Sequence, residues 1–474
     1  MAVSGERLDP YTKRAAFDDL PLLPSSRGAI YGFAACLGVC VGVLAAVRPA
    51  LATVVACAAV FLPLLLMDLA RAVAVYLFVL FFKDLDIVSV GPTALGVLTF
   101  MVFVGVRTRD QRMGLALRGS RTPLTVLALL IAWAALSMLW SRDSGLALED
   151  KPASLLQWLT VLLLVPIAVS CGSTRRSAQT VVLAFVFGAA ATVVVGFAGV
   201  GDAWVDGRLS AGVGDPNHLA ALLIAALALG FGGLRLVRRP ALRLTLVGAE
   251  VVILIGLGAT QSRGGLVGLG VMLLVALWIY ERRRAQILAA TLALLCATGA
   301  FLIASPIASE RLAQAEGGAG RSDIWTVAWR VSADHPIAGV GLNNFVVVSK
   351  DYLRTPGPFE FGYLISRGAV VHNMYLQTLV ELGIIGLGAL LSVFVLSLKA
   401  MIRASRRLVR AGDEDGSFLL QTIATAICGT LAASLFISNA IDPRLWMLIG
   451  VGLGFAATAT AAPAQSEPDP AVVR

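Results

Sequence analysis

The sequence predicts an all-α integral membrane protein, a polytopic helical bundle of about 12–14 transmembrane helices with one long extracytoplasmic loop. Two observations predict this class. Hydrophobic residues make up 58% of the 474-residue chain and charged residues only 14%, whereas a soluble domain is about 45–50% apolar and about 25% charged. The apolar residues also gather in runs close to the roughly 20 residues that a bilayer crossing needs. The composition excludes a soluble enzyme, a disordered chain and a disulfide-stapled secreted domain.

The apolar runs divide the chain in order. Residues 1–27 are polar, with no cleavage signal after the first apolar run, and predict a retained cytoplasmic N-terminal tail. Residues 28–304 predict the first part of the transmembrane bundle, 305–372 the long extracytoplasmic loop, and 373–460 the last part of the bundle. Residues 461–474, rich in Ala, Pro and acidic side chains, predict a disordered cytoplasmic tail. The 14 candidate spans are 28–47, 50–67, 69–82, 87–106, 124–140, 153–170, 178–200, 217–234, 244–260, 264–280, 285–304, 373–398, 417–438 and 444–460.

Basic residues set the orientation of these spans. With the N-terminus inside, 25 of the 38 Lys and Arg fall in cytoplasmic segments. Six of the others lie in the loop 305–372, which is too long for the positive-inside rule to count strongly. The net charge of +9 is therefore explained by cytoplasmic loops that face membrane lipids, and no nucleic-acid partner is expected.

The long loop 305–372 is expected to be functional, because long connections in compact proteins usually are. Within it, Ile324, Val327, Ala328 and Val331 recur at helical spacing and predict a short amphipathic helix over 321–330. We expect this helix to rest on the outer membrane–water boundary, with His335-Pro336 ending it and Gly339-Val-Gly341 forming a turn.

A polar stripe opens the span 373–398. Asn373, Gln377 and Glu381 follow His372 at four-residue intervals, which places them along one face of a helix. Lipid cannot satisfy such groups, so the stripe faces either a cavity or neighbouring spans to which it hydrogen-bonds. His372 lies at the membrane surface, where a neutral imidazole could act as a general base near pH 7, or could be structural.

Arginines on the outer side form the second polar feature. Arg263 lies in a hairpin of a few residues between two spans, and Arg208, Arg321 and Arg367 also fall on the outer side. The positive-inside rule disfavours these positions. Arginine binds phosphate in a bidentate manner, so several together would suit a diphosphate, whereas a snorkelling surface role is the simpler explanation for any one of them.

A third feature, Gly214-Asp-Pro-Asn-His218, opens the span 217–234. Asp-Pro is typical of a turn, and Asn217 could cap the helix. The sequence contains no Walker A motif, zinc-type HExxH or GxGxxG after a strand. Few carboxylates precede spans on the outer side, so neither a metal site nor a cofactor is expected.

The motifs in order resemble the O-antigen ligase / O-antigen polymerase (Wzy-type) superfamily of bacterial membrane glycosyltransferases. The resemblance covers about residues 205–390. It rests on Arg208-Leu-Ser-Ala-Gly-Val-Gly-Asp-Pro-Asn-His-Leu-Ala220, Gln261-Ser-Arg-Gly-Gly265, Arg321-Ser-Asp-Ile-Trp325, His335-Pro-Ile-Ala-Gly-Val-Gly-Leu-Asn-Asn-Phe345, and His372-Asn-Met-Tyr-Leu-Gln377 with Glu381-Leu-Gly383.

The resemblance implies a GT-C-like fold in the cytoplasmic (inner) membrane with the active site facing outward. It implies that a glycan moves from an undecaprenyl-diphosphate-linked donor to a glycan, lipid or protein acceptor, in an inverting and metal-independent reaction. By carry-over, Arg263 and Arg321 would hold the diphosphate and His372 would activate the acceptor hydroxyl. Arg208, Asn217, Arg367, Asn373, Gln377 and Glu381 are then expected to be substrate-binding residues.

Two other functions stay open. A non-enzymatic transporter or flippase of lipid-linked glycans would also have many spans, but it would favour internal repeats and polar residues near the midplane. A cell-division or cell-shape glycan polymerase of similar architecture would use an outer carboxylate as base, and Asp323 would then matter more than His372.

Overall fold

A computed structural model of the chain describes residues 68–83, 111–148, 154–211, 213–280, 321–353 and 370–461, with a few isolated positions elsewhere. Residues Phe61–Arg474 form one compact unit, to which every element below belongs. The predicted spans 28–47, 50–67, 87–106 and 285–304 and both predicted tails lie outside the described residues, apart from isolated positions in the spans.

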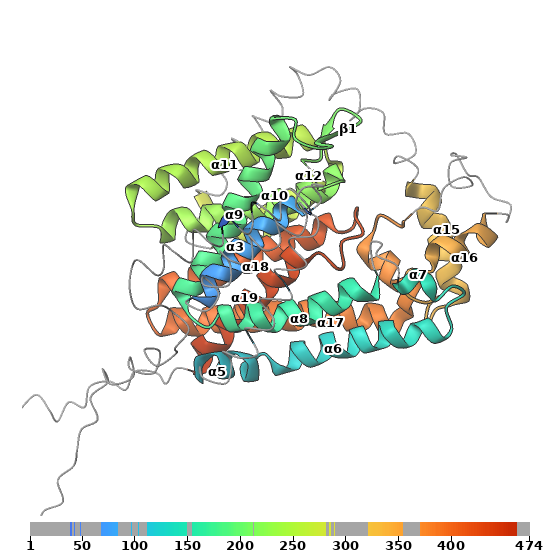
Figure 1. Cartoon of the computed structure of the whole chain (residues 1–474). Helices are drawn as coiled ribbons and strands as arrows, with labels where there is room; N and C mark the ends of the chain where they lie inside the picture. Colours follow the sequence, from blue (N-terminus) through green and yellow to red (C-terminus); the bar gives the residue numbers. More distant parts are fainter. Residues whose placement is uncertain are drawn as a thin grey trace, which may run out of the picture. The chain divides into compact units, whose positions relative to one another are not determined.

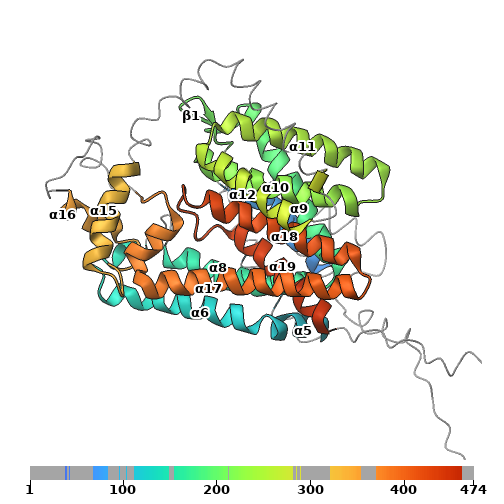
Figure 2. The ribbon, with the colours of Figure 1, turned by 180° about the vertical axis from the view of Figure 1, so that it is seen from behind.

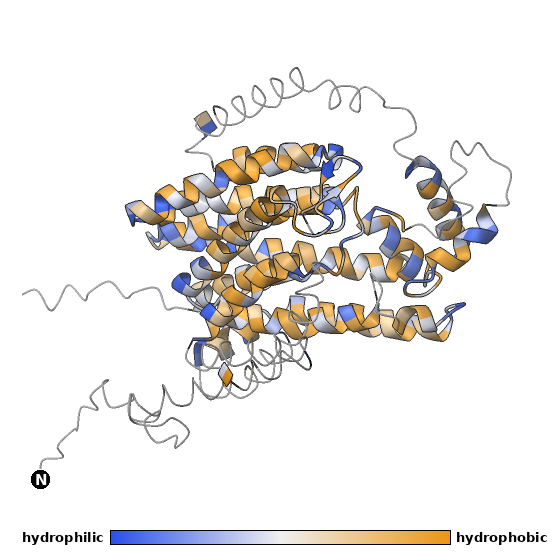
Figure 3. Ribbon diagram, turned by 45° about the horizontal axis from the view of Figure 1, so that its top comes forward, coloured by the Kyte–Doolittle hydropathy of each residue, from blue (hydrophilic) through white to orange (hydrophobic). Residues whose placement is uncertain are grey.

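Ten apolar helices correspond to the remaining predicted spans. Six are long and apolar enough to cross a membrane, and four are shorter. Figure 3 shows apolar residues along these helices and hydrophilic residues toward their ends. The helices are α3 (Leu69–Val79, continued by the 3₁₀ turn η2, Leu80–Phe82), α6 (Arg121–Leu136, continued by η3, Ser137–Leu139), α8 (Leu155–Cys171), α9 (Arg175–Phe197), α10 (Pro216–Leu236), α11 (Pro240–Thr260), α12 (Arg263–Ile279), α17 (Met374–Arg410), α18 (Glu414–Ala433) and α19 (Pro443–Ala461). The predicted all-α membrane fold is confirmed.

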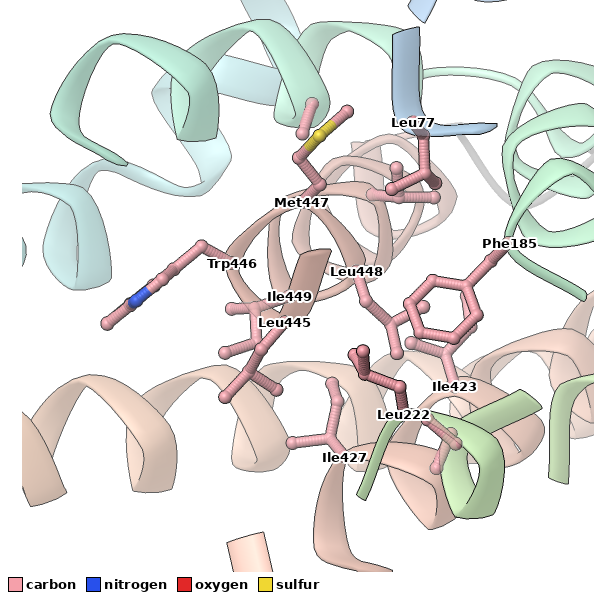
Figure 4. Packing of buried hydrophobic residues seen from close by; sticks show 14 of the residues in the cluster. Leu77, Phe185, Leu222, Ile423, Ile427, Leu445, Trp446, Met447, Leu448 and Ile449 are labelled. Carbon is pink, nitrogen blue, oxygen red and sulfur yellow. The ribbon is translucent and has the colours of Figure 1, made fainter. Parts of the chain in front are cut away.

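Helices distant in sequence pack together in this bundle. α19 packs against α8, and α18 packs between α10, α12 and α17. α6 and α17 run side by side, as Figures 1 and 2 show from opposite sides. Figure 4 shows the centre of the core, where Leu448 of α19 lies beside Phe185 of α9 and Leu222 of α10. The last described helix thus packs against spans from the first half of the chain.

Shorter elements lie between the apolar helices. They are α5 (Gln111–Gly119), α7 (Gly145–Leu148), the antiparallel pair β1 (Trp204–Val205) and β2 (Arg208–Leu209), α15 (Arg321–Asp334) and α16 (Phe345–Tyr352). α15 matches the predicted amphipathic helix. α5, α16 and the β-hairpin were not predicted.

Contacts gather the connecting segments at the two ends of the bundle. At one end, Met374 donates its backbone N–H to the carbonyl oxygen of Ser434 at 3.0 Å. At the other end, Arg175 pairs with Asp413 at 2.6 Å, just before α18 begins. Each end therefore brings together connections that the alternation of basic residues assigns to one side of the membrane.

Candidate active site

His372 is the residue directly before the cap of α17. Asn373 caps the helix, because its Oδ1 accepts the N–H groups of Tyr375 and Leu376 at 3.0 Å. His372 itself has a left-handed backbone (φ 52°), which costs a non-glycine residue of order 1–3 kcal/mol. This strained position is held on one side by the cap and on the other by Val371, whose carbonyl oxygen accepts the Trp325 indole N–H at 3.0 Å.

The electrostatic surroundings of His372 favour its neutral form. Burial lowers its pKa below the ordinary value of 6.5, and Arg321 lowers it further, while Asp215 acts in the opposite direction. Arg321 and Asp215 both act on His372, although the three residues come from separate segments. A neutral imidazole at neutral pH can accept a proton from a hydroxyl group.

α15 positions Arg321 at its first residue. Ile324, Val327, Ala328 and Val331 are all buried, as the helical spacing predicts. This apolar face packs against protein, and the location of the helix at the membrane–water boundary stays a prediction. The apolar face forms a cluster with residues of α16 and of the first turns of α17, while Trp329, on the other face, is 60% exposed.

Arg263 stands at the start of α12, in the hairpin between α11 and α12. Gln261 ends α11 with a left-handed backbone (φ 47°), and Ser262 caps α12 by accepting the Gly265 N–H at 3.0 Å. These two residues reverse the chain within a few positions. Arg263 is exposed at this corner, as the short hairpin predicts.

Arg208 and Asn217 hydrogen-bond to residues of the same hairpin. Arg208 donates to the Thr260 carbonyl oxygen at 2.9 Å and to the Asn217 Oδ1 at 3.0 Å. Asn217 Oδ1 also accepts the Ser262 hydroxyl at 2.8 Å. Asn217 is therefore not the cap of α10, which was the simpler prediction. Asp215 caps that helix, with its Oδ1 accepting the Asn217 N–H at 2.6 Å.

The segment between α18 and α19 connects the hairpin to α15. Phe436 lies against Gly264, where an added Cβ would come within 2.6 Å of the Phe436 Cβ. The ring of Phe436 also lies 6.3 Å from that of Trp325, centroid to centroid. Phe436 therefore links the segment that carries Arg263 to the helix that carries Arg321. Sequence analysis missed this residue, because a phenylalanine at the end of an apolar run has no distinguishing signal.

The polar stripe of α17 is buried, as predicted. Gln377 donates its Nε2 to Glu381 Oε1 at 3.1 Å, and both side chains line a cavity of about 20 Å³ together with Ser438. Such a cavity has room for about one water molecule. The buried oxygens Gln377 Oε1 and Ser438 Oγ have no hydrogen-bond partner in the described part of the chain. The stripe thus faces a small cavity, which is one of the two expected arrangements, while its Gln377–Glu381 hydrogen bond is made within α17 itself.

α17 is broken at Gly383, just below the stripe, where the backbone has φ 66° and ψ −170°. The break leaves carbonyl oxygens without their usual partners in the helix. The predicted Gly339–Gly341 turn supplies them, because Val340 N–H donates to Val380 O and Gly341 N–H donates to Glu381 O, both at 2.9 Å. The long loop is therefore fastened to the helix that follows His372.

A buried charge cluster lies beside this site, and sequence analysis did not single it out. His218 Nε2 hydrogen-bonds Asp442 Oδ2, and Arg444 donates to both oxygens of the same carboxylate. Although burial opposes ionisation, Arg444 and His218 hold the pKa of Asp442 well below its usual range. The available signal was Asp442-Pro-Arg444 in a short connection between two apolar runs.

Two predictions about the site are left without a structural test. Arg367 lies outside the described residues. Within the described ranges, no group of three or more His, Cys, Asp or Glu side chains could hold a metal ion. Metal independence stays a prediction.

Comparison with known proteins covers the central part of this site with a family model. Residues 248–391 match the family model described as O-Antigen ligase. The match runs from α11 into α17 and includes Arg263, Arg321 and His372, whereas Arg208, Asn217 and the His218 cluster lie outside it. No curated protein matches the chain. The match confirms the resemblance seen in the motifs: the chain is a helical membrane protein in which residues 248–391 match an O-antigen ligase domain, which supports a place in the O-antigen ligase and polymerase superfamily.

Proposed function

We propose that the protein transfers a glycan from an undecaprenyl-diphosphate-linked donor to an acceptor hydroxyl at the outer face of the cytoplasmic membrane. The reaction inverts the anomeric carbon and needs no metal ion. Arg263 and Arg321 bind the diphosphate, and His372 is the general base. The acceptor can be a glycan, a lipid or a protein.

The observation that carries this proposal is the meeting of a cation and a neutral imidazole at one end of the bundle. Arg321 begins the helix whose Trp325 hydrogen-bonds the carbonyl oxygen of Val371, the residue before His372, and its charge lowers the pKa of His372. The Arg263 hairpin is joined to the same place through Phe436, which contacts both Gly264 and Trp325. A diphosphate leaving group needs cationic partners, and an attacking hydroxyl needs a base, so this pair of functions fits glycosyl transfer.

The chemistry follows from these positions. The acceptor oxygen attacks the anomeric carbon while His372 takes the hydroxyl proton. The bond between that carbon and the diphosphate oxygen breaks, and its electron pair stays on the oxygen. Arginine forks stabilise the charge that develops there, which is the role a metal ion has in other glycosyl and phosphoryl transfers. Attack on the face opposite the leaving group inverts the anomeric configuration.

Five of the remaining expected substrate residues lie on segments that contact the Arg263 hairpin or follow His372. Arg208 and Asn217 brace the hairpin, and Asn373, Gln377 and Glu381 lie below His372. We propose that they position donor and acceptor, together with Arg367 from the loop.

Transfer by the purified protein in nanodiscs tests the proposal. A diphosphate-linked glycan donor should give undecaprenyl diphosphate and a product of inverted configuration, in buffer containing excess EDTA. The matched monophosphate-linked donor should be a poor substrate. Activity that EDTA abolishes and magnesium restores would contradict the metal-independent mechanism. Movement of intact lipid-linked glycan across the bilayer without transfer would favour a flippase.

A further inference from the structure

A second histidine lies within the same group of segments and is held by a buried carboxylate. His218 is in the first turn of α10, and its Nε2 contacts Asp442 Oδ2. Arg444 donates two hydrogen bonds to Asp442, from Nε to Oδ1 at 3.0 Å and from Nη2 to Oδ2 at 2.9 Å. The side chains of Asp442 and Arg444 are 1% and 0% exposed, whereas that of His218 is 21% exposed.

The contacts leave one ring nitrogen of His218 for proton exchange with a substrate. Asp442 is ionised and accepts from Nε2–H, so Nδ1 is the remaining nitrogen. Within the described part of the chain, the His218 ring makes its hydrogen bond through Nε2. A carboxylate that orients an imidazole and balances the charge of its imidazolium form is the arrangement that acid–base enzymes use. If Asp442 were only structural, Arg444 alone would satisfy its charge and hydrogen bonds. The contact between Asp442 and the accessible His218 therefore calls for another explanation.

His218 is located between the two halves of the proposed site. Asp215, which accepts the His218 backbone N–H at 3.0 Å, influences the pKa of His372. Asn217, the preceding residue, contacts Ser262, which precedes Arg263. Asp442 and Arg444, from the α18–α19 connection, are the charged groups next to the His218 ring. Asp215 lies at the start of the same helix. Arg208 and His372 follow at greater distance, on the far side of Asn217 and Asp215 respectively.

We propose that His218 is a second catalytic residue, the general acid that protonates the departing diphosphate, with Asp442 as its positioning residue. This inference rests on the proposed function. When the carbon–oxygen bond breaks, the electron pair goes to the diphosphate oxygen, and that oxygen takes the Nδ1 proton of His218. The acceptor proton goes to His372, so the two histidines end in exchanged protonation states, and water restores both. Arg444 keeps Asp442 ionised in a buried place.

The direct test is His218→Gln, in which the side-chain amide can still donate to Asp442. The matched control is His335→Gln, because His335 is exposed on the turn after α15. Single-turnover transfer is measured with the native donor and with a donor carrying sulfur on a non-bridging position of the sugar-linked phosphate, whose leaving group is less basic. Wild-type use of the diphosphate donor tests the proposed function separately.

For His218→Gln, transfer of the native donor should fall about 10²–10⁴-fold, donor binding should remain, and the loss should be much smaller with the thio donor. The double variant Asp442→Asn/Arg444→Gln, which leaves no lone buried charge, should show the same pattern, with a smaller loss for the thio donor than for the native donor. Equal losses with both donors would overturn the proposal and make the cluster structural.

Discussion

The indole N–H of Trp325 donates to the carbonyl oxygen of Val371 at 3.0 Å, and this single contact ties the helix that begins at Arg321 to the residue before His372. The two ends of this bond are 46 residues apart, with residues 354–369 of the loop between them outside the described ranges. The diphosphate-binding and base functions of the proposed site therefore depend on one another's placement.

Trp325→Phe tests this dependence, because it keeps an aromatic ring beside Phe436 and removes the hydrogen bond. A net loss of about 0.5–1.5 kcal/mol in the placement of α15 predicts a fall in transfer of roughly two- to tenfold. Trp329→Phe is the control and should transfer normally, because Trp329 lies on the other face of the same helix and is 60% exposed. Steady-state transfer with both variants is the measurement, and equal rates would show that the bond does not align the site.

The pH dependence of transfer reports His372. Its pKa is lowered from 6.5 by burial and by Arg321, so the imidazole is neutral above that value and is lost as a base only at lower pH. The acid limb of the single-turnover profile should therefore have its midpoint below 6.5. Because the folded pKa is the lower one, the unfolded chain binds more protons than the folded protein as the pH falls through 6.5. The contribution of His372 to the free energy of unfolding therefore decreases as the pH falls. A midpoint above 6.5 would assign the limb to another group.

Gly383 should be the least replaceable glycine of α17. Its φ is 66°, and an added Cβ would lie 2.0 Å from the carbonyl oxygen of Ile337. Gly383→Ala should therefore lower the thermal unfolding temperature in detergent and reduce transfer, because the 336–341 turn must move away. Gly388→Ala is the control in the same helix, with nothing within 4 Å of its added Cβ. It should be neutral or stabilising by up to about 1 kcal/mol. Similar losses in the two variants would argue against the fastening role of the turn.

Orientation in the membrane is tested by labelling single cysteines in a Cys-less background. Lys350 and Arg410 are both exposed and lie at opposite ends of the bundle. Lys350→Cys in α16 should react with an impermeant thiol reagent in intact cells, and Arg410→Cys at the end of α17 should react only after permeabilisation. The reverse pattern would put His372 on the cytoplasmic side and remove the basis of the proposed function.

Local patterns predicted most of the fold. Apolar runs gave the ten described spans to within a few residues at most ends, and helical spacing located α15, because both signals depend on neighbouring residues. α17 extends beyond its predicted end at 398 to Arg410, since its last turns are amphipathic and basic rather than uniformly apolar.

The site was only partly predictable, because its remaining members are paired across the chain. His218 and Asp442 are 224 residues apart, and nothing in either local sequence indicates the other. The capping role expected for Asn217 was wrong for the same reason, since its partners Arg208 and Ser262 come from other connections. The break at Gly383 depends on a turn that precedes it by more than 40 residues.

The central claim is that arginines bind the diphosphate and His372 acts only when the acceptor attacks. Donor binding and single-turnover transfer of Arg263→Lys, Arg321→Lys and His372→Ala in nanodiscs test it most directly, with Arg142→Lys, an exposed arginine paired with Asp351, as control. Lysine keeps the charge and loses the bidentate fork, so both lysine variants should bind donor poorly. His372→Ala should bind donor nearly normally while transfer falls about 10²–10⁴-fold. Normal transfer by His372→Ala, or loss of donor binding in that variant, would contradict the claim.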